Sequence, residues 1–550
     1  MTKHRSIEIA EAAEQPWDVI VIGAGMGGCA ATYAIAQAGL RVLVLEKGQQ
    51  DFKASATVDA TETDPERRLS IGRWPHQISG VVDERRFDTW PPLGCGVGGS
   101  TLLYAAAVDR FRPVDFAPQT LPDGRVVSWP FDYRTLEPYY RKAEALLQVS
   151  GTPDPQAPQM IYDLAPPAEA STRDRWFMTR FARAGLNPYR LHYANLNRPG
   201  CDACLGRVCL KECKRNARNS FMTAALQSGR VSICEKVTVV RLNAEPDRVR
   251  SVRVKAAQGE VDLTAQAVVV AAGAYFTPVL LLNSANTHWP DGLANQNDQV
   301  GRNLMFHADL RIALWSKRGL DGTGPKKSIA LRDFYERPDG TKFGEIQSTG
   351  AEARYGNVIY VLRQRFDQSR FARWQLLRHL LRIPALLADR LLGGATIFAL
   401  ILEDYPYPEN RVQADPQTPS GMRFYYTIPQ ELRQRGRQLR KLVDQSFKGM
   451  MRLWLSYDLE LNHGHPCGTC RAGNDPRTSV VDASGRAHGV QNLYVACGSV
   501  LATSGATNPS LTIAAVALRI GEQIAAQCDP STRNAEGKHL QGAKNRALQE

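Results

Sequence analysis

Four cysteines crowd into one short stretch of the chain, CDACLGRVCLKEC, at positions 201, 204, 209 and 213. The first residues, MTKHRSIEIAEAAEQPW, lack the apolar segment of a secretory signal peptide, so a disulfide framework is not expected. Three interpretations fit: free thiols or disulfides, zinc on four thiolates, or an iron–sulfur cluster held on a short flexible loop. We expect the cluster, with Cys201, Cys204, Cys209 and Cys213 as candidate ligands.

A glycine-rich turn indicates a nucleotide site. The segment VIVIGAGMGG places Gly23, Gly25 and Gly28 after an apolar strand and before a helix, and Glu46 ends the next predicted strand. The glycines allow a tight turn and let the backbone approach a pyrophosphate at the helix N-terminus, while the carboxylate binds ribose hydroxyls. Because Glu46 disfavours a 2′-phosphate, FAD or NAD fits better than NADP.

A second glycine turn decides between these two cofactors. The segment LGCGVGGSTLLYAAAV brings Gly98, Gly99 and Ser100 close to another group. A single NAD domain rarely needs such a turn, whereas the phosphates and ring of a flavin do. The sequence therefore predicts FAD.

Two histidines lie together in NHGHPCGTC, at positions 463 and 465. A neutral imidazole suits removal of a proton from a substrate, because its ordinary pKa is near 6.5. A catalytic thiol at Cys467 or Cys470 is the less favoured alternative.

The elements that must position these residues belong to a chain of 550 residues, which is long enough for several domains or two interleaved ones. No apolar run is long enough to predict a transmembrane helix. The net charge of +13 is dispersed, and no nucleic-acid-binding module is visible, so we expect no nucleic acid partner. The segment YFTPVLLLNSA predicts a helix that begins at Pro278.

Residues 17–528 resemble the glucose–methanol–choline (GMC) oxidoreductases, which are FAD enzymes that oxidise alcohols and sugars. The resemblance rests on the glycine turns and on WPFDYRTLEPYY, VVVAAGAYFTPVLLLNSA, VGRNLMFH (with Phe306 where Asp is usual), ENRVQADP, HPCGTC and NPSLTIAAVALR. It implies an α/β fold in which a Rossmann-like FAD-binding domain, of p-hydroxybenzoate hydroxylase-like architecture, is interleaved with an α+β substrate domain built on an antiparallel sheet.

The expected division of the chain follows from this resemblance. It comprises the first part of the FAD-binding domain (15–115), a connecting or lid region (116–200), the Cys-rich iron–sulfur loop (201–222), the second part of the FAD-binding domain (223–308), the substrate-binding domain (309–464), a C-terminal catalytic and FAD-binding part (465–528) and a disordered tail (529–550).

The resemblance also assigns roles to residues. It implies that His465 is the base while a hydride passes to flavin N5, and that Asn508 donates a hydrogen bond to the substrate oxygen and contacts FAD. Val237 and Gly273 are further expected FAD contacts. Family members that attach FAD covalently use a histidine where this chain has GGSTLLY, so we expect non-covalent FAD.

A subgroup of the family, the bacterial FAD-dependent glucose and sorbitol-type dehydrogenase subunits, carries a three-iron cluster at the position of the cysteine stretch. Cys204, Cys209 and Cys213 reproduce its later spacing, whereas Cys201 stands three residues before Cys204 rather than beside it, which leaves the first ligand open and a four-iron cluster possible. We therefore expect a dehydrogenase that passes electrons from a sugar or other alcohol through the cluster to an external acceptor.

Several partners and alternatives follow from that expectation. The acceptor would be a protein, a quinone or a cytochrome, a small partner subunit is possible, and the location would be cytoplasmic or, by export with a partner subunit, periplasmic. The main alternative is an oxygen-using alcohol oxidase with a structural cysteine loop. A lyase on the same fold and a non-enzymatic electron-transfer flavoprotein are the others.

A basic amphipathic stretch, RQRFDQSRFARWQLLRHLLRIPALLADRLLGG, has Arg and Leu at helical spacing and is expected to break at Pro384. It predicts a surface helix whose apolar face joins the substrate domain. The alternative is a lid, or a docking face for a membrane or an electron-transfer partner.

Overall fold

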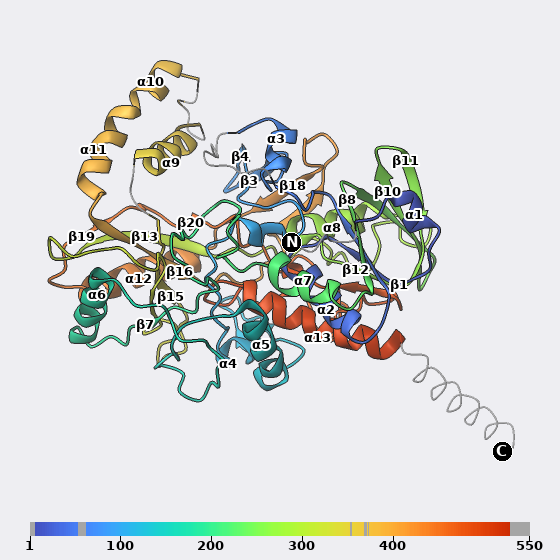
Figure 1. Cartoon of the computed structure of the whole chain (residues 1–550), viewed down its shortest axis with the longest axis horizontal. Helices are drawn as coiled ribbons and strands as arrows, with labels where there is room; N and C mark the ends of the chain where they lie inside the picture. The colour runs from blue at the N-terminus through green and yellow to red at the C-terminus, as the bar shows by residue number, and fades with distance from the viewer. Residues whose placement is uncertain (1–5, 53–61, 352–354, 368–370, 372, 529–550) are drawn as a thin grey trace, which may run out of the picture.

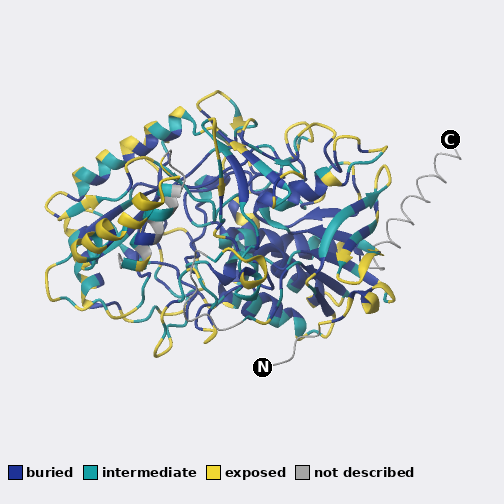
Figure 2. Cartoon of the chain, turned by 90° about the horizontal axis from the view of Figure 1, so that it is seen from above, coloured by how far each residue is buried: buried dark blue, intermediate teal, exposed yellow. Residues whose placement is uncertain are grey.

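The computed structural model describes residues 6–52, 62–351, 355–367, 371 and 373–528, and the expected disordered tail lies outside this part of the chain. Two sheets dominate the molecule, one on each side of Figure 1. Buried residues concentrate around the sheet on the right, whereas the helices on the left are largely intermediate or exposed (Figure 2).

The first sheet is parallel and five-stranded. Its strand order is β21 (Leu493–Val495), β12 (Ala265–Val270), β1 (Trp17–Ile22), β2 (Val42–Glu46) and β8 (Val231–Glu235). The strands are runs of Val, Ile and Leu because both faces are covered. Helix α2 (Met26–Gln37) packs against the long C-terminal helix α13 (Ser510–Cys528), which in turn contacts α5 (Tyr133–Leu147).

The second sheet is antiparallel and seven-stranded. It contains β19 (Arg452–Trp454), β13 (Ala308–Trp315), β16 (Ala395–Leu402), β15 (Gly344–Ser348), β14 (Ile329–Leu331) and β7 (Tyr189–Arg190), and β20 (Glu460–Leu461) also pairs with β13. Helices α6 (Thr172–Arg183) and α12 (Gln430–Ser446) bury apolar side chains against it in one core. The expected α/β fold, with an antiparallel sheet in the substrate part, is confirmed.

The two parts of the molecule are interleaved along the chain. Strands β17 (Arg411–Ala414) and β18 (Met422–Tyr426) form a four-stranded sheet with β3 (Ile78–Val82) and β4 (Arg85–Thr89). Gly80 permits this pairing, because a Cβ there would lie 2.3 Å from the ring of Phe424. Strands near residue 80 and residue 420 are therefore neighbours in space.

The remaining elements are shorter or peripheral. A three-stranded sheet of β9 (Thr238–Ala244), β10 (Val249–Ala256) and β11 (Gly259–Leu263) lies beyond the parallel sheet, and β5 (Gln119–Thr120) pairs with β6 (Val126–Val127). The other helices are α1 (Ile9–Ala13), α3 (Pro65–Ser70), α4 (Pro113–Phe116), α7 (Thr223–Leu226), α8 (Gly273–Asn283), α9 (Tyr355–Asp367), α10 (Gln375–Leu380) and α11 (Arg382–Leu392), with short turns η1 (Gly99–Leu102), η2 (Arg218–Met222) and η3 (Gly498–Val500). None of the described helices combines the length and apolar character needed to cross a membrane.

Candidate active site

One cavity of about 1180 Å³ lies between the parallel and the antiparallel sheets. Its lining includes Ile22 and Leu45 from the first sheet and Gln347 and Ala399 from the second. Most of the residues predicted to bind FAD or substrate meet there: Gly23, Gly25, Glu46, Gly99, Ser100, Val237, Gly273, His465 and Asn508.

One side of the cavity, the glycine wall, is formed by Gly23, Gly25, Gly99 and Gly273. A Cβ on Gly25, which precedes the first residue of α2, would meet no protein atom within 4 Å and would project into open space. A Cβ on Gly273, the first residue of α8, would also meet no protein atom within 4 Å. This bare backbone at two helix N-termini is a cradle that fits the phosphates of FAD.

Two predicted cofactor residues, Gly28 and Gly98, do not line the cavity but shape the turns behind it. A Cβ on Gly28 would lie 1.9 Å from the carbonyl oxygen of Gly23, so this glycine allows the close packing of helix and strand. Gly98 has a φ of +112°, and its N–H donates to the carbonyl oxygen of Ala24 at 2.7 Å. Gly28 and Gly98 therefore contribute to the cofactor site indirectly, because they shape the turns that carry the glycine wall.

Glu46 ties the two glycine turns together. Its Oε2 accepts from the N–H of Ala24 at 2.8 Å, and its Oε1 accepts from the N–H groups of Gly48 and Gly96 at 2.8 and 3.1 Å. The carboxylate is buried but borders the cavity, as a residue that binds ribose hydroxyls must.

The opposite side of the cavity, the polar wall, is formed by Gln347, His465 and Asn508. His465 Nδ1 lies 3.1 Å from His307 Nδ1, and His307 Nε2 lies 3.0 Å from the carbonyl oxygen of Gly505. Since a carbonyl can only accept, His307 carries its proton on Nε2 and accepts on Nδ1, so His465 donates from Nδ1. The lone pair of His465 is therefore on Nε2.

Asn508 is oriented by a neighbour in the same way. Gln347 Nε2 donates to Asn508 Oδ1 at 2.7 Å, which leaves the Asn508 amide N–H₂ as the group that lies 3.5 Å from His465 Nε2. A base nitrogen and an amide donor thus face the same point of the cavity, where an alcohol oxygen could give a proton to one and accept a hydrogen bond from the other.

The electrostatics keep His465 neutral. Burial, the neighbouring His307 and the charge of Lys327 together lower the pKa of His465 well below its ordinary value. Burial also lowers the pKa of His307 to about 4. Both rings are therefore uncharged at neutral pH, each with a single N–H, which the hydrogen-bond chain requires.

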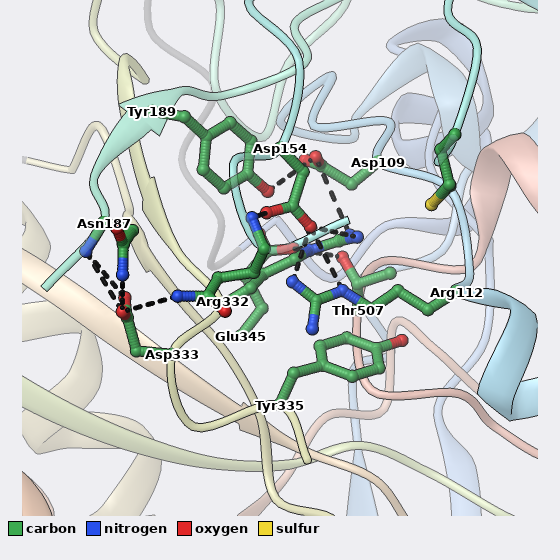
Figure 3. Close-up of polar contacts among 12 residues, drawn as sticks. Asp109, Arg112, Asp154, Asn187, Tyr189, Arg332, Asp333, Tyr335, Glu345 and Thr507 are labelled. Carbon is green, nitrogen blue, oxygen red and sulfur yellow. Dashed lines mark hydrogen bonds and ion pairs between the residues drawn. The ribbon is translucent and has the colours of Figure 1, made fainter. Parts of the chain in front are cut away.

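A buried ionic network contacts Thr507, the residue before Asn508 in the chain (Figure 3). Thr507 Oγ1 donates to Glu345 Oε2 at 2.7 Å, and Arg332 Nε donates to the same oxygen at 2.9 Å. Glu345 and Gln347 are two residues apart on β15 and point to the same face of the sheet. Burial, and then the nearby Asp109, raise the pKa of Glu345 to about 7.

The cysteine stretch forms a loop against the glycine-wall side of the cavity. Leu205 and Gly206 line that cavity, and the fully buried Lys214 holds the loop by donating from Nζ to the carbonyl oxygens of Cys204 and Arg207, each at 2.8 Å. The loop thus brings the cysteine stretch next to the expected FAD site.

The four cysteines of this loop lie as two close pairs. Cys204 interacts with Cys209 through their thiols, and Cys201 does so with Cys213. Among the residues that the structure describes, no three His, Cys, Asp or Glu side chains are placed to hold a metal ion. As folded here the loop does not present the ligand set of a cluster, and the iron–sulfur expectation stays a prediction.

The other residues singled out by the sequence lie outside the cavity lining. His463 is half-buried among aromatic rings, with its Nδ1 3.3 Å from the hydroxyl of Tyr275 and its ring 5.2 Å from that of Phe306. Burial raises the pKa of the Cys467 and Cys470 thiols well above the ordinary value, which does not favour a thiolate nucleophile.

Sequence reasoning missed two residues of the site. His307 is the last residue of VGRNLMFH. This motif was used only for the family resemblance, but it could have pointed to His307 as a residue of the site. Gln347 lies in no motif. It reaches Asn508 because β15 lies beside the segment before that residue, where the N–H of Glu345 donates to the carbonyl oxygen of Ala506 at 3.0 Å.

Fold and site together define a flavoprotein oxidoreductase, and comparison with known proteins agrees. Residues 18–89 match the model of an FAD binding domain, and residues 406–517 match that of a GMC oxidoreductase C-terminal domain. Paromamine 6′-oxidase of Streptomyces fradiae is 30% identical over 93% of this chain and 92% of its own. The chain belongs to the GMC oxidoreductase family.

Other similar proteins include both oxidases and dehydrogenases. The fructose dehydrogenase large subunit of Gluconobacter japonicus is 26% identical over 92% of this chain and 97% of its own. The crystal structure of pyridoxine 4-oxidase from Mesorbium loti shares the fold, with a TM-score of 0.63 at 19% identity, over 92% of this chain and 99% of that one.

Proposed function

We propose that this FAD-dependent oxidoreductase is a dehydrogenase that converts a CH–OH group of a sugar or another alcohol to a carbonyl. The observation that carries the proposal is the pair formed by His465 Nε2 and the Asn508 amide, 3.5 Å apart and facing the same cavity as the glycine wall.

Each residue of the polar wall that faces the substrate would have its own role in the reaction. His465 Nε2 takes the hydroxyl proton, and the Nδ1 proton that it donates to His307 keeps the ring in that orientation. The Asn508 amide donates to the substrate oxygen and stabilises the charge that develops there without competing for the proton. When bound, FAD supplies the two-electron acceptor for the hydride that leaves the carbon.

The lining near the polar wall supports a hydrophilic substrate. Asp309, Arg311, Lys327 and Glu460 all border the cavity close to the antiparallel sheet. Such a surface favours hydrogen bonds to several hydroxyl groups over contact with a long hydrocarbon chain. Fructose and a propanediol, named for two of the similar dehydrogenases, each carry more than one hydroxyl group.

The place of the cysteine loop supports an acceptor other than oxygen. Four free cysteines lie in a loop that borders the cavity, and the hydrogen bonds of Lys214 hold that loop in place. If Cys201, Cys204, Cys209 and Cys213 hold an iron–sulfur cluster, it would supply one-electron chemistry beside the flavin site. Binding it would require the two thiol pairs to close around the iron.

The first experiment separates these enzyme classes. Purified protein with bound FAD is mixed anaerobically with a panel of sugars and alcohols, and bleaching of the flavin absorbance identifies a substrate. Turnover is then compared with oxygen and with an artificial dye as the acceptor. Fast turnover with the dye and slow turnover with oxygen supports the dehydrogenase, and the reverse result identifies an oxidase.

A second experiment addresses the cysteines alone. Iron and acid-labile sulfide are measured in anaerobically purified protein, beside the Cys209→Ser and Cys213→Ser variants. We expect iron in the parent protein and its loss in both variants, with FAD retained. If the parent protein contains zinc or no metal, the iron–sulfur cluster is excluded and the cysteine loop has a structural role.

A further inference from the structure

Two consecutive helices, α10 and α11, stand away from the body of the protein at the upper left of Figure 1. We call residues 373–392 the helical arm. It carries many of the exposed large apolar side chains of the molecule, including Leu376 at 74% exposure, Leu391 at 71% and Trp374 at 63%. Exposed apolar patches of this kind mark interaction sites more often than chance.

Five of the exposed apolar residues of the arm lie at helical spacing on one face. Leu376, Leu380, Ile383, Leu387 and Leu391 recur at intervals of three or four residues, and all five are exposed. A soluble surface helix normally turns such a face toward the protein core.

The opposite face is the one that contacts the protein. Ala385 is completely buried, and α11 packs against α9. The arm therefore presents its apolar face to the surroundings, contrary to the expectation that this face joins the substrate domain.

The break in the arm also differs from the expected one. The helix is interrupted at Leu381, and α11 begins at Arg382 with Pro384 inside its first turn. The N–H groups in the first turn of a helix have no acceptor within the helix. A proline there, which has no N–H, therefore removes no helical hydrogen bond. The apolar face consequently continues across the junction rather than ending at Pro384.

Basic residues accompany the apolar face. The arm contains Arg373, Arg378, Arg382 and Arg390, and its one acidic residue, Asp389, accepts from the backbone N–H of Tyr355 with Oδ1 at 3.0 Å. The chain as a whole carries a net charge of +13. A helix pair with apolar and aromatic side chains outward and arginines among them has the composition of helices that lie on anionic lipid surfaces.

We propose that the helical arm docks this enzyme on an anionic membrane surface, with the apolar face entering the interface and the arginines binding lipid phosphates. The charge pattern favours lipid over a second copy of the chain. In a twofold-symmetric dimer the arm would face its own copy, and the arginines of the two arms would then repel one another.

Docking in this manner would bring the cavity close to the membrane. Leu392 of α11, and Val358 and Leu362 of α9, line the same cavity as His465. The C-terminal end of the arm, at Leu392, therefore lines one part of the cavity, and the glycine wall that forms the FAD cradle lines another part.

The test is co-sedimentation of the full-length, FAD-loaded protein with vesicles. Vesicles of phosphatidylcholine mixed with phosphatidylglycerol should bind it, vesicles of phosphatidylcholine alone should bind it more weakly, and added salt should weaken the binding. The Leu380→Asp/Leu387→Asp variant should bind at least about tenfold more weakly, because charges replace side chains at the centre of the apolar face.

A matched control replaces apolar residues of similar exposure elsewhere. Val126 is 65% and Leu453 is 49% exposed, and the Val126→Asp/Leu453→Asp variant should bind vesicles as the parent does. Flavin content should be equal in all three proteins, which reports folding independently of turnover.

Three outcomes would overturn the proposal. The first is the absence of binding to vesicles that contain phosphatidylglycerol, and the second is an equal loss of binding in the control variant. The third is a concentration-dependent dimer in sedimentation equilibrium that the Leu380→Asp/Leu387→Asp variant dissociates, which would assign the arm to contact between copies. None of them depends on the substrate or acceptor, so a failure of the proposed function would not affect the result.

Discussion

The two walls of the cavity are built by different means. The glycine wall is backbone at the N-termini of helices, and Gly23 and Gly25 belong to one continuous strand–turn–helix segment. The polar wall is made of side chains from three distant segments, which supply Gln347, His465 and Asn508. The first needs the absence of side chains, whereas the second needs each side chain held in one orientation by a partner.

The largest effect should follow from filling the glycine wall. Gly25→Val adds a side chain whose Cβ meets no protein atom within 4 Å and projects into the cradle, so we expect a folded protein without FAD and without activity. Flavin released by acid precipitation measures the loss and also shows whether the parent protein binds FAD non-covalently. Gly394→Val is the control, because a Cβ there also meets nothing within 4 Å and lies outside the cavity.

Removing the base should slow the reaction without affecting the binding of FAD by the glycine wall. His465→Ala is expected to slow reduction of the flavin by substrate by about 10²-fold or more, the usual size of a general-base effect. Stopped-flow absorbance under anaerobic conditions gives the rate, and FAD content should not change. The exposed His288 provides the control variant, His288→Ala. A His465→Ala protein that reduces its flavin at the parent rate would exclude this residue as the base.

A smaller effect should come from the residue that orients Asn508. Gln347→Leu removes the donor to Asn508 Oδ1, and the loss of one such hydrogen bond corresponds to about a tenfold slower flavin reduction at saturating substrate. The exposed Gln296, changed to Leu, is the control. If Gln347→Leu raises only the substrate concentration needed for half-saturation, Gln347 binds substrate rather than positioning Asn508.

The smallest expected change is with pH. Because burial, His307 and Lys327 lower the pKa of His465 well below its ordinary value, the ring stays uncharged and Nε2 stays free of a proton as pH falls through 6.5. The value of kcat/KM should therefore change less than about twofold between pH 7.5 and 6 and decline only at lower pH. An acid limb centred at or above pH 6.5 would mean that His465 is protonated there, and would contradict the neutral hydrogen-bond chain.

The contrast between the walls also explains what the sequence could predict. The glycine wall follows from local spacing, since strand, turn, helix and Glu46 lie within one segment. His465 and Asn508 were identified through resemblance to the GMC family rather than from their spacing. Their partner Gln347 becomes visible only when the antiparallel sheet is formed, because its contact joins residues far apart in the chain, whereas the segment VGRNLMFH could have pointed to His307.

Helix α8 gives a second example of the same limit. The sequence predicted a helix that begins at Pro278, whereas α8 begins at Gly273 and contains this proline. A proline inside a helix leaves the carbonyl four residues earlier without its usual donor. Here that carbonyl, of Ala274, accepts from Thr469 Oγ1 at 2.6 Å. No local pattern could reveal a partner so distant in sequence.

The interleaved sheets have a consequence for biosynthesis. The strand at Ile78–Val82 pairs with Met422–Tyr426, and the parallel sheet is completed only by Leu493–Val495. During translation the N-terminal half must therefore wait, with apolar strand edges unpaired, until nearly the whole chain has left the ribosome. Such late pairing makes folding slow and leaves the nascent chain exposed to aggregation. Assembly of the cofactor site is thus a late event, because the cavity is complete only after His465 and Asn508 have joined the glycine turn near residue 25.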